Sequence, residues 1–349
     1  MKLRQIFFLT CCFLFNTNKS FSQLTRIWKQ EQFGYIDVSG KIIVPYKYSS
    51  ASSFSDSMGL VSRVDENYET FYGYINHLGE EVISLKYSNA QDFHNGFALV
   101  VKDDQNLVID KKGNEYKIDN LYFDRDERKD NFVSEGLVLI KKDERYGFSN
   151  LKNEVVIPFD YDFIYPFAEG FAITTKNKKI YFLDKTEKKT ETNFGDCGIR
   201  FVKSLLPVQD ALTQKWGVIN AKLDTVVGFN YTDLGEFKNG LAIFVNDDDK
   251  EKGFLNEKGE VVFKEGYSAR IYPFYEGRFF VETSYDNLLK LYDESFREIK
   301  QFEKTATIFK PGFKHGLCLI EFVNKKEDKN EYYSVYINKK GEIVWKSDM

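Results

Sequence analysis

The stretch that decides the fold of this chain is Trp216-Gly217-Val218-Ile219-Asn220, because variants of it return along the sequence. In each of the clear copies, an aromatic residue and a glycine open a short apolar segment that closes on Asp or Asn. The other clear copies are Phe33-Gly34-Tyr35-Ile36-Asp37, Tyr72-Gly73-Tyr74-Ile75-Asn76 and Tyr146-Gly147-Phe148-Ser149-Asn150. Such self-similarity predicts a repeat architecture in which each copy is one supersecondary unit.

The residue that closes each copy sets the period of the repeat. It recurs at Asp37, Asn76, Asp110, Asn150, Asp184, Asn220, Asn256, Asp293 and Asn338. Neighbours in this series are 34 residues apart at the closest (Asn76 to Asp110) and 45 at the widest (Asp293 to Asn338). Tandem copies of one unit produce such a near-constant spacing. We count eight full units and a ninth, half-length unit from Tyr333 to Trp345, in a single array over residues 23–349.

Each copy continues into a turn whose residues predict a β-hairpin. Asn or Asp at the first turn position accepts a hydrogen bond from the backbone two residues on, and a glycine three places later supplies a positive φ. Five units have that glycine: Gly40, Gly79, Gly113, Gly259 and Gly341. Asn153 tolerates the same conformation in the fourth unit. Glu187, Leu223 and Phe296 stand at this place in the fifth, sixth and eighth units, so we expect those turns to be built differently.

Two further landmarks follow the turn. Short β-branched runs such as Ile42-Ile43-Val44 have the length of buried strands. A phenylalanine, a glycine and a third apolar strand come next, as in Phe93 to Val100. A large aromatic side chain once per unit would stack the units into one continuous core. We therefore expect a set of such residues to be buried: Phe167, Phe237, Phe274 and Phe313.

These residues resemble a known family. Lys215-Trp216-Gly217-Val218-Ile219-Asn220, followed by Tyr231 and Phe237-Lys238-Asn239-Gly240-Leu241-Ala242, is similar to the bacterial WG (also called KWG) β-repeat. The resemblance covers roughly residues 28–345. It implies a β-rich repeat array, often secreted and largely without an assigned activity, and it brings no catalytic residues to transfer.

The expected fold class is all-β, with tandem units of short antiparallel β-meanders. Eight units of three or four short strands have the size of propeller blades, which favours a closed, β-propeller-like ring. An open β-superhelix is the alternative, because the ninth half-unit leaves an uneven count for closure.

Residues 1–22 differ from the rest of the chain. Lys2 and Arg4 precede an apolar run from Ile6 to Phe15, and Ser20-Phe21-Ser22 follows. This order predicts a secretory signal peptide that is cleaved after Ser22. The apolar run is too short for a membrane anchor, since ten residues at about 1.5 Å each span half of a bilayer core of about 30 Å. A lipoprotein would need Cys11 or Cys12 at the cut, but the apolar run continues past both.

Charge and cysteine content narrow the possible partners. Loss of residues 1–22, with their three basic side chains, takes the formal net charge from −4 to −7. An acidic chain lacks the electrostatic footprint of a nucleic-acid-binding protein. Cys197 and Cys318 remain, and Cys318 stands where other units have alanine, so it is interpreted as a small buried side chain. The sequence leaves open whether these two cysteines are free.

No catalytic motif stands out. HExxH, CxxC, GxSxG and phosphate-loop patterns are missing from the sequence. His77, His94 and His315 all fall in expected turns and are interpreted as solvated turn residues. The run from Asn246 to Lys250 invites a calcium interpretation, but Lys250 would take the place of an oxygen ligand, so a solvated hairpin is favoured.

Two recurring residue types could still carry function. Carboxylates from different units could converge for glycosidase chemistry, although the Asp and Asn series already has a structural role in the turns. One tyrosine series could form a sugar-stacking surface, but its regularity favours packing. Its members are Tyr48, Tyr87, Tyr161, Tyr231 and Tyr267.

The sequence thus favours a non-catalytic binding or scaffolding protein, exported to the periplasm, outer surface or exterior of a bacterium. Its partner would be a protein or glycan, and the mature chain is expected to contain no transmembrane segment. We assign no catalytic, cofactor-binding or metal-binding residue, and the binding residues stay unknown. The alternative is a carbohydrate-binding or carbohydrate-active protein on a propeller-like scaffold.

Overall fold

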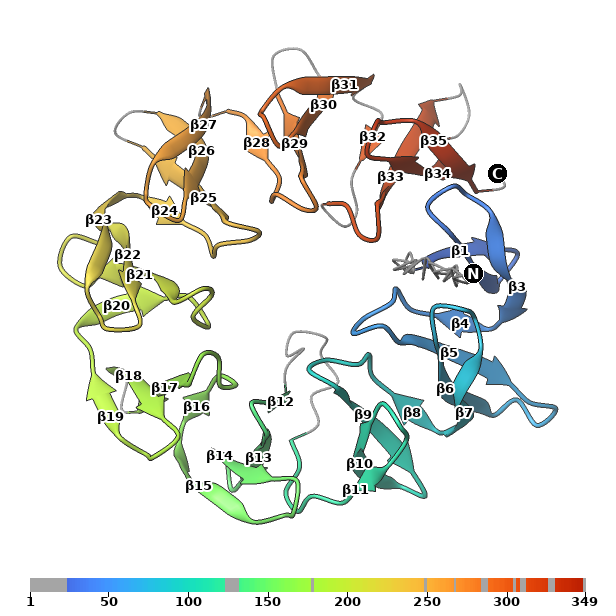
Figure 1. Cartoon of the computed structure of the whole chain (residues 1–349), viewed down its shortest axis with the longest axis horizontal. Helices are drawn as coiled ribbons and strands as arrows, with labels where there is room; N and C mark the ends of the chain where they lie inside the picture. The colour runs from blue at the N-terminus through green and yellow to red at the C-terminus, as the bar shows by residue number, and fades with distance from the viewer. Residues whose placement is uncertain are drawn as a thin grey trace, which may run out of the picture.

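The computed structural model describes residues 24–122, 132–176, 179–247, 250–266, 268–283, 288–303, 306–307, 312–325 and 330–347. Within these ranges the strands form nine antiparallel sheets, arranged as blades of a ring (Figure 1). No helix in the described ranges is long and apolar enough to cross a membrane. The all-β, propeller-like prediction is therefore confirmed, and the open superhelix is wrong.

Most blades have four strands, which we name A to D from the axis outward. Blade 1 comprises β1 (Thr25–Lys29), β2 (Gln32–Ile36) and β3 (Ile42–Tyr48), which correspond to strands B, C and D. Blade 2 comprises β4 (Ser50–Ala51), β5 (Gly59–Val64), β6 (Thr70–Ile75) and β7 (Glu81–Tyr87); blade 3 β8 (Asn89–Ala90), β9 (Phe97–Lys102), β10 (Gln105–Asp110) and β11 (Glu115–Tyr116); blade 4 β12 (Val133–Ser134), β13 (Leu137–Lys142), β14 (Arg145–Asn150) and β15 (Val155–Tyr161); blade 5 β16 (Phe163–Ile164), β17 (Phe171–Lys176), β18 (Lys179–Asp184) and β19 (Lys189–Glu191).

The second half of the chain repeats this plan. Blade 6 comprises β20 (Phe194–Cys197), β21 (Leu205–Asp210), β22 (Trp216–Asn220) and β23 (Thr225–Tyr231); blade 7 β24 (Asp233–Leu234), β25 (Leu241–Asn246), β26 (Glu251–Asn256) and β27 (Val261–Gly266); blade 8 β28 (Arg270–Ile271), β29 (Arg278–Glu282), β30 (Leu288–Asp293) and β31 (Glu298–Glu303); blade 9 β32 (Ala306–Thr307), β33 (Leu317–Lys325), β34 (Asn330–Asn338) and β35 (Ile343–Lys346).

The repeat in the sequence and the blade in the structure are out of phase. Each sequence unit holds strands C and D of one blade and strands A and B of the next. The segment from Tyr333 to Trp345, which was expected to be a half-unit, therefore belongs to β34 and β35 of a four-stranded sheet. In the described residues, the incomplete blade is blade 1, with three strands. Each unit spans a blade interface, so the covalent repeat itself ties neighbouring blades together.

In the copies that have it, the glycine after the first aromatic lets strand D pack closely against strand C. A Cβ built on Gly147 would lie 2.5 Å from the carbonyl oxygen of Ile157, and one on Gly34 would lie 2.5 Å from that of Val44. Strand pairing between C and D is irregular at this point in blade 4 and blade 1. Since the obstacle is backbone and not a movable side chain, a Cβ at these glycines would force strand D to shift.

The turns between strands C and D have one geometry in all nine blades of the described chain. The predicted glycines at the third position have φ values between 78° and 87° (Gly40, Gly79, Gly113, Gly259 and Gly341), as expected. The expectation of different turns in the fifth, sixth and eighth units is wrong, because Glu187, Leu223 and Phe296 also have positive φ, of 64°, 69° and 59°.

The Asp or Asn that opens the turn explains this tolerance. Oδ1 of Asp184 accepts hydrogen bonds from the N–H groups of Thr186 at 2.8 Å and Lys188 at 3.0 Å, and the N–H of Glu187 donates to the Asp184 carbonyl. The same bonds from Gly40 and Gly79 close the glycine turns. They offset a left-handed conformation that costs a residue other than glycine about 1–2 kcal/mol.

We expect Gly113→Val to lower the free energy of unfolding by about 1–2 kcal/mol and Gly113→Asn by less, since Asn tolerates positive φ. A Cβ at this position would meet Ile83 at 3.7 Å, an ordinary contact, so the pair of variants isolates the backbone effect. Urea denaturation of both variants measures it. Equal losses in the two variants would contradict the turn assignment.

The predicted phenylalanines form the contacts between blades. Phe167 is 1% exposed and its ring centroid lies 5.1 Å from that of Phe148 on strand C of the preceding blade. Phe93 packs on Tyr74 in the same way at 4.6 Å. The other members expected to be buried are buried: Phe237, Phe274 and Phe313. The core is therefore a series of layers between blades, each closed by an aromatic side chain from the following blade.

Blade 9 packs against blade 1 and closes the ring. The ring centroids of Trp28 in β1 and Trp345 in β35 lie 5.0 Å apart, and Ile27, Leu317 and Tyr336 pack around them. Every sheet in the described chain consists of strands that are consecutive in sequence. Side-chain packing, and not the exchange of a strand between the two ends, therefore closes the ring.

Candidate binding face at the inner turns

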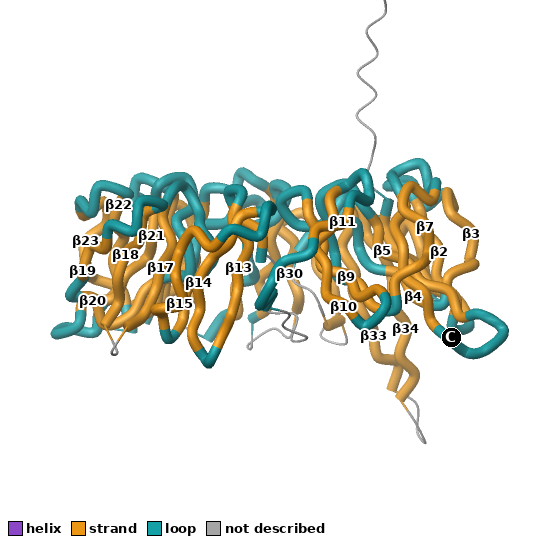
Figure 2. The backbone as a smooth tube through the Cα atoms, turned by 90° about the horizontal axis from the view of Figure 1, so that it is seen from below, coloured by secondary structure: helices purple, strands orange, loops and turns teal. Residues whose placement is uncertain are grey.

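Because consecutive strands are antiparallel, the A–B and C–D turns lie on one face of the ring and the B–C turns on the other. The A–B turns point toward the ring axis (Figure 1). Figure 2 shows the disc from its edge, with the hairpin of β33 and β34 extending beyond one face. We call the face that carries the A–B and C–D turns the turn face.

The A–B turns share one tight geometry. Two successive residues have positive φ in each of the eight turns of the described chain, which is the type I′ hairpin turn. The second of the two is glycine in blades 3, 4, 5, 7, 8 and 9 and serine in blades 2 and 6. The first, with φ between 49° and 59°, is polar in all eight: Asp56, Asn95, Glu135, Glu169, Lys203, Asn239, Glu276 and His315.

Several of these polar side chains join one turn to the next. Oδ2 of Asp56 accepts a hydrogen bond from the N–H of Gly96. Oε1 of Glu135 lies 3.1 Å from the N–H nitrogen of Gly170, and Oε2 of Glu169 lies 2.5 Å from that of Ser204. Neutral side chains bind carbonyl groups instead, as when Nδ2 of Asn239 donates to Phe274 at 3.0 Å. The A–B turns thus form a chain of contacts around the axis.

Lysines in the C–D turn of the next blade add ion pairs to these A–B turns. Lys111 lies 2.8 Å from Asp56, and Lys185 lies 2.9 Å from Glu135. Between blades 6 and 7 the two signs are reversed: the A–B turn carries the lysine, Lys203, which lies 2.8 Å from Glu257 in the C–D turn of blade 7. Because of this reversal, a blade placed beside the wrong neighbour would bring like charges together.

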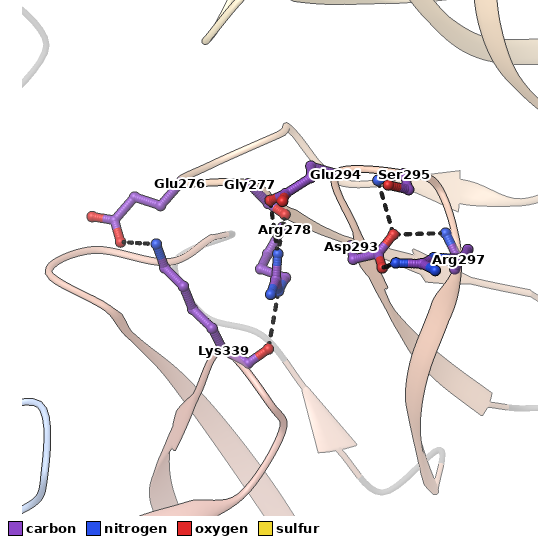
Figure 3. A network of polar contacts seen from close by, with 8 residues as sticks. All are labelled: Glu276, Gly277, Arg278, Asp293, Glu294, Ser295, Arg297 and Lys339. Carbon is purple, nitrogen blue, oxygen red and sulfur yellow. Dashed lines mark hydrogen bonds and ion pairs between the residues drawn. The ribbon is translucent and has the colours of Figure 1, made fainter.

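Figure 3 shows this arrangement between blades 8 and 9. Lys339 lies 3.3 Å from Glu276. Glu276 also accepts hydrogen bonds from the N–H groups of His315 at 2.7 Å and Gly316 at 2.9 Å. Arg278 donates to the carbonyl of Lys339 at 2.9 Å. Burial alone would raise the pKa of Glu276, but these N–H groups and the ammonium outweigh it and hold the pKa below its usual value.

A depressed carboxyl pKa makes part of the stability depend on pH. Glu276 contributes this stability above its unfolded pKa of about 4.3, and the contribution is lost as pH falls through the lower folded value. We expect Glu276→Gln to be less stable than the natural protein at pH 7, with a difference that shrinks as the pH falls below the unfolded pKa of glutamate. Urea denaturation at pH 7 and at acidic pH measures the difference. An unchanged gap would contradict an electrostatic role for Glu276.

The three histidines lie in turns, as predicted, but His315 is not a solvated residue. Its Nε2 lies 3.2 Å from the carbonyl oxygen of Phe54, in blade 2, and since a carbonyl accepts only, the proton must sit on Nε2. Burial lowers the pKa of His315. His77 and His94 are half-buried and each has a partner. The side chain of His315 therefore links blade 9 to blade 2, which are not consecutive in the ring.

The tyrosine series at the end of strand D serves packing. Tyr48, Tyr87 and Tyr161 are at most 1% exposed, and Tyr231 is half-buried, while Tyr267 lies outside the described residues. The hydroxyl of Tyr87 donates to Glu115 at 3.1 Å. The hydrogen bond from Lys86 to that carboxylate, more than any other contact, lowers the pKa of Glu115 to about 2. A sugar-stacking surface made of these rings is excluded for the buried members.

The remaining chemical candidates do not converge. Within the described ranges, no group of three His, Cys, Asp or Glu side chains could hold a metal ion. Of the acidic run after Asn246, Asp248 and Asp249 lie outside the described residues. Cys197 in blade 6 and Cys318 in blade 9 are free thiols, and burial raises the pKa of each to about 12. Neither thiol is therefore activated for nucleophilic chemistry.

The sequence comparison agrees with the phase of the repeat. The family model described as "WG containing repeat" matches residues 33–68, 72–105, 146–179, 216–250 and 253–284. Each matched segment begins at or within strand C of one blade and extends past the A–B turn of the next. No curated protein sequence matches the chain.

Solved structures with a similar course of the chain include three with low sequence identity. Hsv2p of Kluyveromyces lactis is 11% identical, with 83% of this chain and 97% of that chain covered and a TM-score of 0.36. AztD of Citrobacter koseri is 10% identical, with coverage of 80% and 94% and a TM-score of 0.34. BamB of Moraxella catarrhalis is 12% identical, with coverage of 91% and 98% and a TM-score of 0.30.

Proposed function

Because this chain belongs to the family of WG-containing repeats and folds as a ring of blades, we propose that it is a non-catalytic binding or scaffolding protein of the bacterial envelope or exterior. The observation that carries the proposal is the way in which carboxylates of the A–B turns are paired. Asp56, Glu135 and Glu276 are each engaged by backbone N–H groups and a lysine of the next blade. Such groups hold the turn face in shape, and repeat arrays bind partners through extended surfaces of this kind.

Export is part of the proposal and rests on residues 1–22. We expect the protein made in its native host to begin at Gln23 after cleavage behind Ser22. Mass spectrometry of the purified protein measures the position. A mature product that retains Met1 would refute export by this signal.

The function is tested with the mature chain, residues 23–349, immobilised and exposed to envelope extract. We expect a partner or glycan to be retained, and expect Lys238→Glu on the turn face to weaken retention more than Lys142→Glu, the same charge change near a B–C turn. A panel of glycosidase, peptidase and esterase substrates should stay unchanged. Turnover that is abolished by replacing one or two specific carboxylates would favour the carbohydrate-active alternative instead.

A further inference from the structure

A small pocket lies between blades 7 and 8, beside the A–B turn of blade 7. Its volume is about 100 Å³. The apolar wall includes Ile243, Phe254 and Phe274, and the polar residues Glu236 and Lys238 also line it. Because apolar wall and polar groups occur together, the pocket has the composition of a subsite for a ligand or side chain.

At this pocket, blade 7 has a glycine where two other blades have a tyrosine. The N–H of Gly235 donates to the carbonyl of Ile243 at 2.9 Å, just as that of Tyr272 donates to Phe280 in blade 8 and that of Tyr165 to Ile173 in blade 5. The three residues therefore occupy the same register position, directly after strand A.

The two tyrosines fill the corresponding space at their own interfaces. Tyr272 is 6% exposed and packs with Phe280 and with Phe313 of the next blade. Tyr165 packs in the layer that contains Ile173 and Phe201. Phe280 and Ile173 correspond to Ile243, and Phe313 and Phe201 correspond to Phe274. The chain itself thus shows that this position accommodates an aromatic ring.

The space beside Gly235 is open to such a ring. A Cβ built on Gly235 would meet the carbonyl oxygen of Ile243 at 3.7 Å, an ordinary contact, and no closer atom. At the pocket wall, Nζ of Lys238 lies 3.3 Å from the hydroxyl oxygen of Tyr275, and Glu236 accepts a hydrogen bond from the N–H of Ile199 at 3.3 Å. These bonds hold the two polar side chains beside the pocket.

We propose that this pocket is an anchor subsite for an aromatic side chain of a partner polypeptide. The inference rests on the proposed binding function and names one contact within it. The occupant follows from Tyr165 and Tyr272, whose rings reach the equivalent space from an extended backbone on the turn face. Aromatic residues are also the side chains that most often anchor protein interfaces in such pockets.

The test uses the mature chain and p-cresol, the side-chain analogue of tyrosine, in isothermal titration calorimetry. We expect saturable binding with a Kd in the millimolar range, as suits a ligand of this size. Gly235→Tyr should weaken it at least tenfold by filling the pocket from within. Gln91→Tyr, which places the same residue at the same register position in blade 3, should leave it within twofold.

The result can overturn the proposal in two ways. Absence of saturable binding refutes the subsite, and equal binding by Gly235→Tyr places p-cresol elsewhere. If Gly235→Tyr does not fold, Gly235→Leu provides the same comparison with a smaller side chain. Because the probe is a small molecule, these outcomes are independent of whether the extract experiment retains a partner.

Discussion

Phe167→Ala is expected to lower the free energy of unfolding by about 3–5 kcal/mol. Phe167 is fully buried between blades 4 and 5, against Phe148, Tyr161 and Leu183. Removal of the ring leaves a cavity that the surrounding strands cannot close, because backbone hydrogen bonds fix their positions. Urea denaturation followed by circular dichroism measures the loss.

Leu212→Ala is the matched control, since Leu212 is 92% exposed and should change the stability by less than about 0.5 kcal/mol. A loss below about 1 kcal/mol for Phe167→Ala would mean that the phenylalanine layer is not core. Comparable results are expected for Phe237 and Phe313, which occupy the same place in blades 7 and 9.

Gly147→Ala is expected to cost about 2–3 kcal/mol although it adds a single methyl group. The new Cβ would lie 2.5 Å from the carbonyl oxygen of Ile157, and relief of this contact must move strand D away from strand C. Overpacking of a rigid site costs about 1–3 kcal/mol, and here the obstacle is backbone.

Gly266→Ala controls for the change in the unfolded chain, because a Cβ at Gly266 meets no atom within 4 Å. We expect this control to be neutral or slightly stabilising. Equal stability of Gly147→Ala and Gly266→Ala would show that strand D can shift freely, and would remove the physical reason for the glycine of the WG motif.

Local features of the fold could be predicted from the sequence because each depends on residues within one hairpin. In the Asx turn, a side-chain oxygen accepts hydrogen bonds from the N–H groups two and four residues later, as at Asp184. Acceptor and donors therefore lie within five consecutive residues. The sequence pattern did not indicate that these hydrogen bonds are sufficient without a glycine. Leu223 adopts a φ of 69° in the same turn.

The candidate site could be predicted to a smaller extent. The glycine of the A–B turn was recognised as a landmark in most units, but the residue that opens the turn had no recurring type: Asp56, Lys203 and His315 share the place. The signal that could have found the turn face is the pairing of opposite charges between an A–B turn and the C–D turn of the next blade. Lys203 pairs with Glu257, whereas the signs are reversed in the pair of Asp56 and Lys111. This pattern can be recognised only when the paired positions are known.

By itself, the sequence determined the repeat, the all-β class, the hairpin turns and the aromatic layer, because these follow from spacing and side-chain type within one unit. Tertiary structure decided where a blade begins, how the ring closes through Trp28 and Trp345, and which inner turn contacts which lysine. It also decided that the tyrosine series is buried and that Gly235 leaves a pocket. The physical reason is that these contacts join residues about one repeat or more apart, and only the assembled ring brings such residues within reach of each other.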